Sequence, residues 1–600
     1  MPIIGGSVSY SKNTEIEETT KILTETAQTY CQDKLEIIYS SFFKIIAGKR
    51  NIEAKGEKVI SFCDKKGVII GRLHSTNSKE KITTSYFNEN VHAAILKTQG
   101  RWLGENIWGS YLCVLFDNDT NSIHIFRDPS GLSSLYFTIF QDSLLFSSEL
   151  SILEDALPVK SNLDWEFFTS YVAYSDLMSM RTPFCNIQEL LPGQHLSFSS
   201  KGYKINPFWS PFLFSFPRDI KDLSRNIVDV FVDSTEKWIE ESPSLCLNLS
   251  GGLDSTALLL AIKKNINNKK HFFALNYTNP EIASSNELEH ARKIAKKYDV
   301  ELLEFDINEA PSLSIASKPH ERWNKPNSTS LNQKRKQEMG QMVSQYGHVE
   351  FIDGFGGDQL FIANVERDFL CDYILNKGLK GFLHKLIETC QINRQSAIDY
   401  SLSTVSNLIS YNYKNKLFFK VEPSWFQPKF KELIRREILY PPFWQEIKKL
   451  PPGKAKHVFA IYQGSFYAEN GLSSYGRSII YPFLSQPLIE LALSIPTYET
   501  YGGDYSRNIF RNAISQHFQT DLVWRQSKGE TSGIFQLGLY TNRKRALELC
   551  MEGQFAQQGL LIKEELYNHI KKIEHGLITH QWPLINLLAA ELWFEAWGYQ

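Results

Sequence analysis

Hydrophobic positions change their spacing abruptly in one stretch of this chain. Leu245, Leu247 and Leu249 alternate with other residues, as side chains on one face of a short strand do. The alternation ends at Ser250-Gly251-Gly252, and the apolar run Thr256–Ile262 that follows is typical of a buried helix. The pattern therefore predicts a strand, a tight glycine turn and a helix in direct succession.

A regular alternation of strands and helices continues beyond this stretch. The pattern predicts strands at 271–277, 300–305 and 348–352, and helices at 287–298 and 339–346. Strands that alternate with helices form a mostly parallel, doubly wound α/β sheet, whose ligands bind at the carboxyl ends of the strands. Farther on, we expect mainly helical structure at 369–475, a helix at 488–495 and an amphipathic helix at 585–597.

The beginning of the chain follows a different pattern. Short apolar segments at 111–116, 123–126, 135–137 and 144–146 are separated by polar turns, which predicts a β meander. Residues 206–211, with Pro217 shortly after them, have the proline and polar content of a linker. We therefore expect two domains, residues 1–205 and 206–600.

Composition narrows the class of protein. Hydrophobic residues make up 42% of the 600 residues and charged residues 22%, as in soluble globular enzymes. The formal net charge of -1 predicts no general attraction to nucleic acid or to a membrane, and no apolar run is long enough for a membrane span. The eight cysteines contain no Cys-x-x-Cys pair, which is typical of reduced thiols in a cytoplasmic protein.

The first glycine turn has the features of a nucleotide site. Two glycines let the backbone approach an anion, and the amides at the start of the helix attract phosphate. Asp254 would repel phosphate directly, so its position indicates a Mg²⁺ ion between carboxylate and nucleotide. Ser250–Ser255 matches neither a Walker loop nor a dinucleotide fingerprint. The alternative is a structural turn in which Asp254 and Ser255 cap the helix.

A second glycine turn follows the strand predicted at 348–352. It reads Asp353-Gly354-Phe355-Gly356-Gly357-Asp358. Because both turns fall at the carboxyl edge of the predicted sheet, we expect Asp254 and Asp358 to converge on one Mg²⁺ ion. The alternative for Asp358 is a carboxylate that caps the turn.

These motifs resemble those of a known enzyme family. Ser250–Ser255 resembles the pyrophosphate-binding loop of the ATP pyrophosphatases, Ser-Gly-Gly-x-Asp-Ser. Arg127–Tyr136 resembles a segment of the N-terminal glutaminase domain of asparagine synthetases. The blocks that resemble the synthetase domain of that family are Ser250–Ser255, Gly354–Asp358, and Arg477–Leu484 with Arg525–Lys528. The resemblance implies a degenerate Ntn-type αββα glutaminase-like domain followed by an adenine nucleotide α-hydrolase-like synthetase domain.

The resemblance also implies a reaction and the residues that perform it. In this family ATP adenylates a carboxylate and releases pyrophosphate, and an amine then attacks the acyl-adenylate to form an amide. Lys528 would stabilise that intermediate, because a fixed ammonium offsets the oxyanion that forms beside phosphate; a solvated surface lysine is the alternative. Asp254 and Asp358 would bind Mg²⁺. The positions implied for ATP are Ser250, Gly251, Gly252, Asp254, Ser255 and Gly357.

Two departures from the family pattern change the expected amine. The family's glutaminases carry a nucleophilic cysteine after the initiator methionine, whereas this chain has Pro2, and residues 1–205 contain no Asn-Gly pair. Glutaminase chemistry is therefore excluded, unless processing exposes an internal residue, and the domain becomes a packing partner or docking surface. Phe355 stands where asparagine synthetases carry a glutamate and β-lactam synthetases a tyrosine. A phenylalanine suits a peptide α-amine, whose pKa of about 7.7–8.0 requires less help with deprotonation.

The third branch of the family fits these departures. Lasso-peptide macrolactam synthetases are bacterial enzymes that activate an Asp or Glu side chain of a precursor peptide and close it onto the peptide's N-terminal amine. The resemblance implies ATP and Mg²⁺ as cofactors, the precursor peptide as substrate, and a leader peptidase and a leader-recognition protein as partners.

Two other interpretations stay open. The first is an ammonia-dependent asparagine synthetase or a β-lactam-synthetase-like enzyme that acts on a small amino acid, against which Phe355 argues. The second is an inactive scaffold that binds a peptide or a partner enzyme, which the intact glycine loop and Lys528 oppose.

Overall fold

The computed structural model describes most of the 600 residues. The described residues are 2–10, 14–31, 35–40, 42–49, 56–62, 65–77, 81–175, 179–216, 222–266, 270–279, 282, 287–315, 322–409, 423–434, 443–471, 479–525, 532–577 and 581–599. Within them no helix is both long and apolar enough to cross a membrane.

The N-terminal domain is a sandwich of two antiparallel sheets. The first has the order β10-β8-β9-β1-β3-β2 and the second β12-β11-β7-β6-β5-β4. Strands of the first sheet are β1 (Ile3–Val8), β2 (Glu36–Tyr39), β3 (Phe43–Gly48), β8 (Tyr136–Phe140), β9 (Ser143–Ser147) and β10 (Gln188–Glu189). Strands of the second are β4 (Lys58–Ser61), β5 (Gly67–Ser75), β6 (Ile107–Asp117), β7 (Ser122–Arg127), β11 (Gln194–Ser199) and β12 (Gly202–Pro207).

Alternation along the strands builds the layers of this sandwich. Ile4 and Val8 of β1 meet Val114 and Ile125 of the second sheet in the core between the sheets. Ile3, on the opposite face of β1, packs with Leu23 of α1 (Thr14–Tyr30). Helix α4 (Leu150–Ala156) joins α1 on that side, and α2 (Glu89–Lys97) and α3 (Arg101–Asn106) cover the second sheet. The expected αββα arrangement is thereby confirmed.

The second domain is built on a five-stranded parallel sheet of order β15-β14-β13-β16-β17. Its strands are β13 (Ser244–Asn248), β14 (His271–Thr278), β15 (Glu301–Asp306), β16 (Glu350–Ile352) and β17 (Ile479–Ile480). The helices between β13 and β16 are α7 (Leu253–Asn265), α8 (Leu288–Lys297) and α9 (Gln333–Met342), and α6 (Leu223–Ile239) precedes β13. The strand order reverses at β13, so the predicted doubly wound sheet is confirmed.

Two element boundaries in this domain differ from the sequence pattern. Helix α9 begins at Gln333, six residues before the predicted start. Its first turns carry lysine, arginine and glutamine with no apolar periodicity, so the sequence pattern did not predict them as helix. Residues Val343–Tyr346, predicted as helix, form a 3-10 turn after α9. The strand predicted at 348–352 is confined to β16, whose partners in β13 begin at Leu245.

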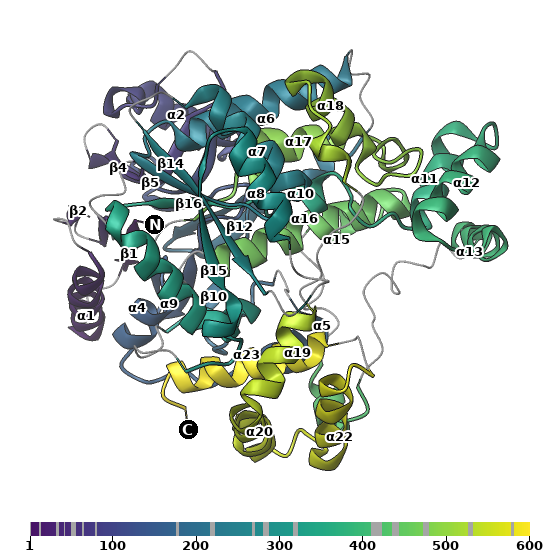
Figure 1. Ribbon diagram of the computed structural model, residues 1–600. Helices are drawn as coiled ribbons and strands as arrows, with labels where there is room; N and C mark the ends of the chain where they lie inside the picture. The colour runs from purple at the N-terminus through teal and green to yellow at the C-terminus, as the bar shows by residue number, and fades with distance from the viewer. Residues whose placement is uncertain are drawn as a thin grey trace.

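The remaining helices form an extension and a C-terminal layer. Helices α11 (Asp368–Lys377), α12 (Phe382–Asn393) and α13 (Ala397–Ile409) project from one end of the molecule (Figure 1). They are followed by α14 (Pro428–Leu433), α15 (Trp444–Ile447), α16 (Pro452–Gly471), α17 (Gln486–Ser494), α18 (Asn508–Phe518), α19 (Ser532–Thr541), α20 (Arg543–Glu552), α21 (Gln554–Gln557), α22 (Lys563–Glu574) and α23 (Trp582–Ala596). Mainly helical structure at 369–475 is confirmed in the described part of that segment.

The last helix, α23, is more buried than its expected amphipathic pattern implies. Leu587, Ala589 and Trp593 are all inaccessible to solvent although they lie on different sides of the helix. The Nδ2 atom of Asn586 donates to the carbonyl of Tyr171 at 3.2 Å, in helix α5 (Trp165–Tyr174) of the N-terminal domain. A helix buried between two layers is apolar on most of its circumference, so the prediction of a solvent-facing side was wrong.

The residues that connect the two domains are buried. Strand β12 runs to Pro207, and Phe208 and Trp209 behind it are buried. The Trp209 indole Nε1 donates to Glu490 of α17 at 2.7 Å. The expected boundary after residue 205 stays a prediction, and the described chain beyond it contributes to the contact between the domains.

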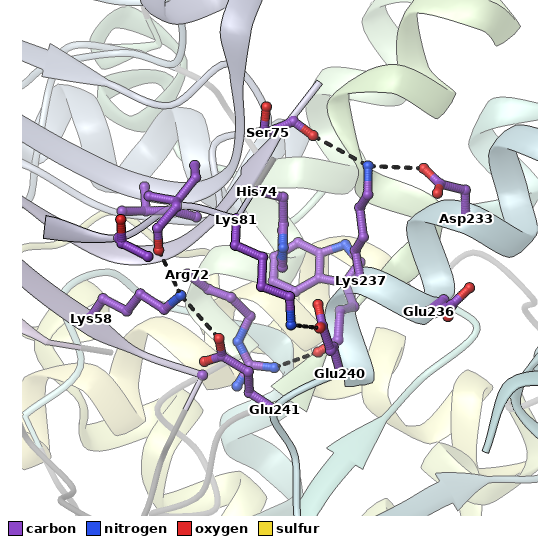
Figure 2. A pocket seen from close by; sticks show the side chains of 15 residues that line it. Lys58, Arg72, His74, Ser75, Lys81, Asp233, Glu236, Lys237, Glu240 and Glu241 are labelled. Carbon is purple, nitrogen blue, oxygen red and sulfur yellow. Dashed lines mark hydrogen bonds and ion pairs between the residues drawn. The ribbon is translucent and has the colours of Figure 1, made fainter. Parts of the chain in front are cut away.

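Charged groups also cross the interface between the domains. A cavity of about 400 Å³ lies between β4, β5 and α6, and Figure 2 shows Lys58, Lys81 and Lys237 reaching across it. Lys58 and Lys81 pair with Glu241 and Glu240 at 2.9 and 2.7 Å, and Lys237 of α6 donates to the carbonyl of Ser75 in β5 at 3.2 Å. The deepest of these contacts belongs to Arg72 of β5, which pairs with Glu350 of β16 and donates to the carbonyl of Trp238 at 2.7 Å.

Arg72→Met is expected to destabilise the protein by about 3–5 kcal/mol, because Glu350, whose side chain is 1% exposed, would stay buried without that cation. The measurement is a shift of the urea midpoint. The control Arg225→Met removes an exposed partner of Asp229 on α6 and should change the midpoint little. Adding Glu350→Leu to Arg72→Met should recover part of the loss; an equally unstable double variant would contradict the uncompensated-charge explanation.

Candidate nucleotide and acyl-substrate site

The first glycine loop connects β13 to α7 and lies against α8. Gly251 has φ of +77°, and a Cβ atom at this position would lie 2.8 Å from the Cβ of His290. Only glycine therefore fits both the backbone conformation and the space. The loop brings backbone amides to the N-terminus of α7, a 13-residue helix whose dipole favours an anion at that end.

Hydroxyl groups line the same loop. The amide of Gly252 donates to the Ser250 hydroxyl at 3.2 Å, and the hydroxyls of Ser250 and Ser255 are also 3.2 Å apart. Thr256 donates to the Gly252 carbonyl at 2.6 Å, which fixes the first turn of α7. The predicted residues Ser250, Gly252 and Ser255 are therefore assembled into one loop.

The second glycine loop touches the first directly. A Cβ atom on Gly354 would lie 3.0 Å from the Cβ of Asp254, and one on Gly357 would lie 2.2 Å from the Asp254 Oδ1 atom. Glycine at both positions is thus what allows the loop after β16 to pass beside α7. Asn248, at the end of β13, donates to Asp353 at 2.7 Å and ties the two strand ends together.

Asp254 and Asp358 meet at the guanidinium of Arg507. Its Nη1 atom lies 2.7 Å from both carboxylate oxygens of Asp254 and 2.8 Å from Oδ1 of Asp358. Burial lowers the pKa of Arg507, but the two carboxylates outweigh this effect and the pKa is raised above its usual value. The expected convergence of Asp254 and Asp358 is therefore present, with an arginine between them.

The residues at this point fit a magnesium ion bound together with phosphate. Among the described residues no group of three or more His, Cys, Asp or Glu side chains forms a metal site. Mg²⁺ in nucleotide enzymes takes one or two carboxylates and completes its shell with phosphate oxygens and water. The carboxylates of Asp254 and Asp358 lie close enough for one nitrogen atom of Arg507 to contact both. They would therefore supply two protein ligands for Mg²⁺ beside a loop suited to phosphate.

Arg507 was not anticipated from the sequence. It precedes α18 in the left-handed conformation, with φ of +54°, and its side chain is 5% exposed. Nothing in the local pattern distinguishes it from other arginines. Its role depends on packing α18 against α6 and α7, a contact between segments about 250 residues apart.

The segment that leads to Lys528 is anchored close to Arg507. Arg511 of α18 donates to the carbonyls of Val523 and Arg525, the latter at 3.2 Å. Burial and the charge of Arg507 lower the pKa of Arg511 to about 10. Arg525 pairs with Glu287, directly before α8, at 3.0 Å. Lys528 itself lies outside the described residues, as does Arg477.

A second cavity opens at the carboxyl ends of four strands of the parallel sheet. It has a volume of about 330 Å³. Asn248, Tyr277, Asp353 and Tyr481 line it at the ends of β13, β14, β16 and β17. Phe355 also lines it, and its ring meets the Tyr481 ring edge-on, with centroids 6.1 Å apart. This cavity adjoins the second glycine loop, so it can hold a substrate next to a nucleotide.

Comparison with protein families divides the chain in the same way as the fold. Residues 75–209 match the glutamine amidotransferase domain family. Residues 226–363 and 475–597 match the asparagine synthase family. The second match includes both glycine loops and Arg507, whereas the helical extension α11–α13 lies between its two segments.

Curated relatives are similar over parts of their length. Asparagine synthetase [glutamine-hydrolyzing] 3 of Bacillus subtilis (strain 168) is 27% identical over 158 residues, which is 26% of this chain and 25% of that protein. The Microcin J25-processing protein McjC of Escherichia coli is 22% identical over 354 residues, 58% of this chain and 60% of that protein. Asparagine synthetase [glutamine-hydrolyzing] 2 of B. subtilis is 24% identical over 189 residues, 29% of this chain and 25% of that protein. The chain thus spans at most 60% of the length of these relatives.

Gly357→Ala is expected to weaken Mg-ATP binding at least about tenfold, or about 1.4 kcal/mol, because the new methyl group would displace the Asp254 carboxylate. Isothermal titration with Mg-ATP measures this. The control Gly340→Ala adds a methyl group in open space on α9 and should leave the affinity unchanged. Unchanged affinity in Gly357→Ala would separate Asp254 from the nucleotide site.

The position of the site in the fold agrees with the residue ranges that match the two families. Two glycine loops at the carboxyl edge of a parallel sheet lie within the asparagine synthase match, and an αββα domain that carries the amidotransferase match precedes them. Residues 75–209 are thus similar to the glutamine amidotransferase domain family, and residues 226–363 with 475–597 are similar to the asparagine synthase family.

Proposed function

We propose that this protein is an ATP-dependent, AMP-forming carbon–nitrogen ligase. The observation that carries the proposal is the contact between the two glycine loops, which brings Asp254 and Asp358 to one point beside a loop suited to phosphate. In the first step a substrate carboxylate attacks the α-phosphorus of ATP, forming an acyl-adenylate and releasing pyrophosphate. In the second step an amine attacks the acyl carbon, loses a proton and displaces AMP, leaving an amide.

Each predicted site residue has a part in this proposal. Ser250, Gly251, Gly252, Ser255 and Gly357 supply amides, hydroxyls and backbone clearance for the phosphates of ATP. Asp254 and Asp358 bind Mg²⁺, which neutralises charge on the phosphates when it is bound. Arg507 holds both carboxylates in place. Lys528 offsets the oxyanion that forms when the amine attacks.

The amine that we propose is the N-terminus of a precursor peptide, and the carboxylate is an Asp or Glu side chain of that peptide. The product is a macrolactam, as in lasso peptides. Phe355 lines the substrate cavity and can neither accept a proton nor donate a hydrogen bond, which suits an amine with a pKa of about 7.7–8.0. The similarity to a microcin J25-processing protein supports the same assignment.

The N-terminal domain has no part in supplying ammonia in this proposal. The residue directly before β1, where the family places its nucleophile, is Pro2, whose ring has no thiol or hydroxyl. The domain instead supports the synthetase sheet through Arg72 and Glu350. A leader peptidase and a leader-recognition protein remain proposed partners, and the cytoplasm of a bacterium remains the proposed location.

A second candidate function is an ammonia-dependent ligase that acts on a small amino acid such as aspartate. The similarity to two asparagine synthetases favours it, and Phe355 opposes it. The two functions differ in the carboxylate that drives pyrophosphate exchange.

Incubation with Mg-ATP and peptides that have a free N-terminus and an internal Asp or Glu tests the main proposal. The expected result is AMP and pyrophosphate in step with a peptide product that is lighter by one water. N-terminal acetylation should abolish this product because no free amine remains. Exchange driven by aspartate alone would instead support the second function, and no exchange with any carboxylate would remove both.

Lys528→Ala should lower the rate of amide formation about 10²–10³-fold, as loss of an oxyanion-stabilising group does. Mg-ATP binding should persist, because the two glycine loops are unchanged. The control Lys544→Ala removes a side chain that is 93% exposed and should have no effect on the rate. Full activity in Lys528→Ala would take Lys528 out of the mechanism while leaving the ATP site in place.

A further inference from the structure

The cavity at the strand ends contains two neighbouring buried cations that the reaction above does not use. Arg335 and Lys336 both line it, and only 7% and 6% of these residues, respectively, are exposed. Both belong to α9, which precedes β16 in the chain. The Arg335 Nε atom donates to the carbonyl of Ala310 at 3.2 Å, which fixes the position of the guanidinium. Long basic side chains are rarely buried to this extent, so their placement calls for a reason.

The charge balance of the cavity favours an anion. Among the described residues that line it, Arg335, Lys336 and Asp353 are the charged side chains. Asp353 already accepts from Asn248 at 2.7 Å and from the amide of Phe355 at 2.8 Å, and burial raises its pKa. Two basic side chains on adjacent residues that line the same cavity attract an anion to it.

Neighbouring residues suit the recognition of a carboxylate attached to a peptide. Ser312, Ser328, Thr329 and Asn332 contribute short polar side chains, and another part of the wall consists of apolar side chains, including Ile534 and Phe535. A small inorganic anion would have no use for the apolar wall. A carboxylate on an organic substrate would use both parts.

We propose that Arg335 and Lys336 bind the carboxylate that is to be activated and so determine that the acyl substrate enters as an anion. This inference rests on the proposed ligase function. The cation pair holds the carboxylate at the strand ends, beside Phe355 and the second glycine loop. The phosphate groups of ATP are the other anions that could reach this cavity, and the experiment separates the two.

The proposal has a pH signature. Burial and the charge of Arg335 lower the pKa of Lys336 to about 7 in the free protein. A bound carboxylate favours the charged form and raises this pKa, so binding takes up a proton. Affinity should therefore be greatest below about pH 7 and fall as pH rises, by up to about tenfold per unit.

The other titratable groups of the cavity act differently. Arg335 keeps its charge over this range, and burial, followed by the charge of Asp353, raises the pKa of Tyr277 to about 12. Burial raises the pKa of the Asp353 carboxyl above its usual value, and its ionised form carries a negative charge that opposes anion binding. Lys336→Arg separates these contributions, because arginine stays charged while Asp353 is unchanged.

The test compares Lys336→Met and Lys336→Arg with the wild type. Two peptides with a free N-terminus are titrated calorimetrically from about pH 6 to about pH 9, one with a single internal Glu and one with Gln in its place. The wild type should bind the Glu peptide at least about tenfold more tightly at low pH, and Lys336→Met should lose this preference. Lys336→Arg should keep the preference and lose most of its pH dependence.

Controls make each outcome decisive. Mg-ATP affinity should stay within about twofold in both variants; a loss equal to that for the peptide would assign the pair to nucleotide phosphate and overturn the proposal. Equal preference for Glu in the wild type and Lys336→Met would overturn it as well. Wild-type protein that prefers the Glu peptide but never exchanges pyrophosphate would refute the ligase function and leave Arg335 and Lys336 only as a carboxylate-binding pair. Thermal unfolding of Lys336→Met verifies that the fold persists.

Discussion

Close contact between two backbone loops is the constraint on which the site depends. The loop after β16 passes so near to α7 that no side chain fits at Gly357, and Asp254 occupies the space that a Cβ would need. This contact requires β13 and β16 to be neighbours in the sheet, with their carboxyl ends level. It places the Asp254 and Asp358 carboxylates where Arg507 reaches both. A parallel sheet with its order reversing at β13 is the arrangement that satisfies these requirements.

The site is electrostatically divided into two parts. At the glycine loops, the carboxylates of Asp254 and Asp358 converge on Arg507, and two carboxylates are the protein ligands that a divalent cation takes. In the cavity beside Phe355, Arg335 and Lys336 exceed the charge of Asp353, which suits an anion. A reaction that joins a carboxylate to Mg-ATP needs both environments at adjacent positions, because each reactant is attracted to one of them.

Local patterns were sufficient for the framework of the molecule and for one side of the site. Alternating leucines and the glycine turn defined β13 and α7, and Ser250, Gly251, Gly252, Asp254 and Ser255 meet in the loop between them. Convergence of Asp358 followed from the rule that parallel strands present their carboxyl ends at one edge. Arg507, Arg335 and Lys336 could not be predicted in this way, since their positions depend on how distant helices pack. The solvent exposure of helix α23 was predicted wrongly for a related reason, because the layers that bury its two sides are far apart in the sequence.

The buried pair of Arg72 and Glu350 has a consequence for modular engineering. Each domain contributes one charge, and each charge is nearly inaccessible to water. A chimera that replaces only the sandwich with that of a relative would keep Glu350, but the residue that faces Glu350 would then come from the relative. Such grafts should therefore transfer β5 and β16 as a matched set. By the same reasoning, excising the sandwich would leave the Glu350 charge in the sheet without Arg72.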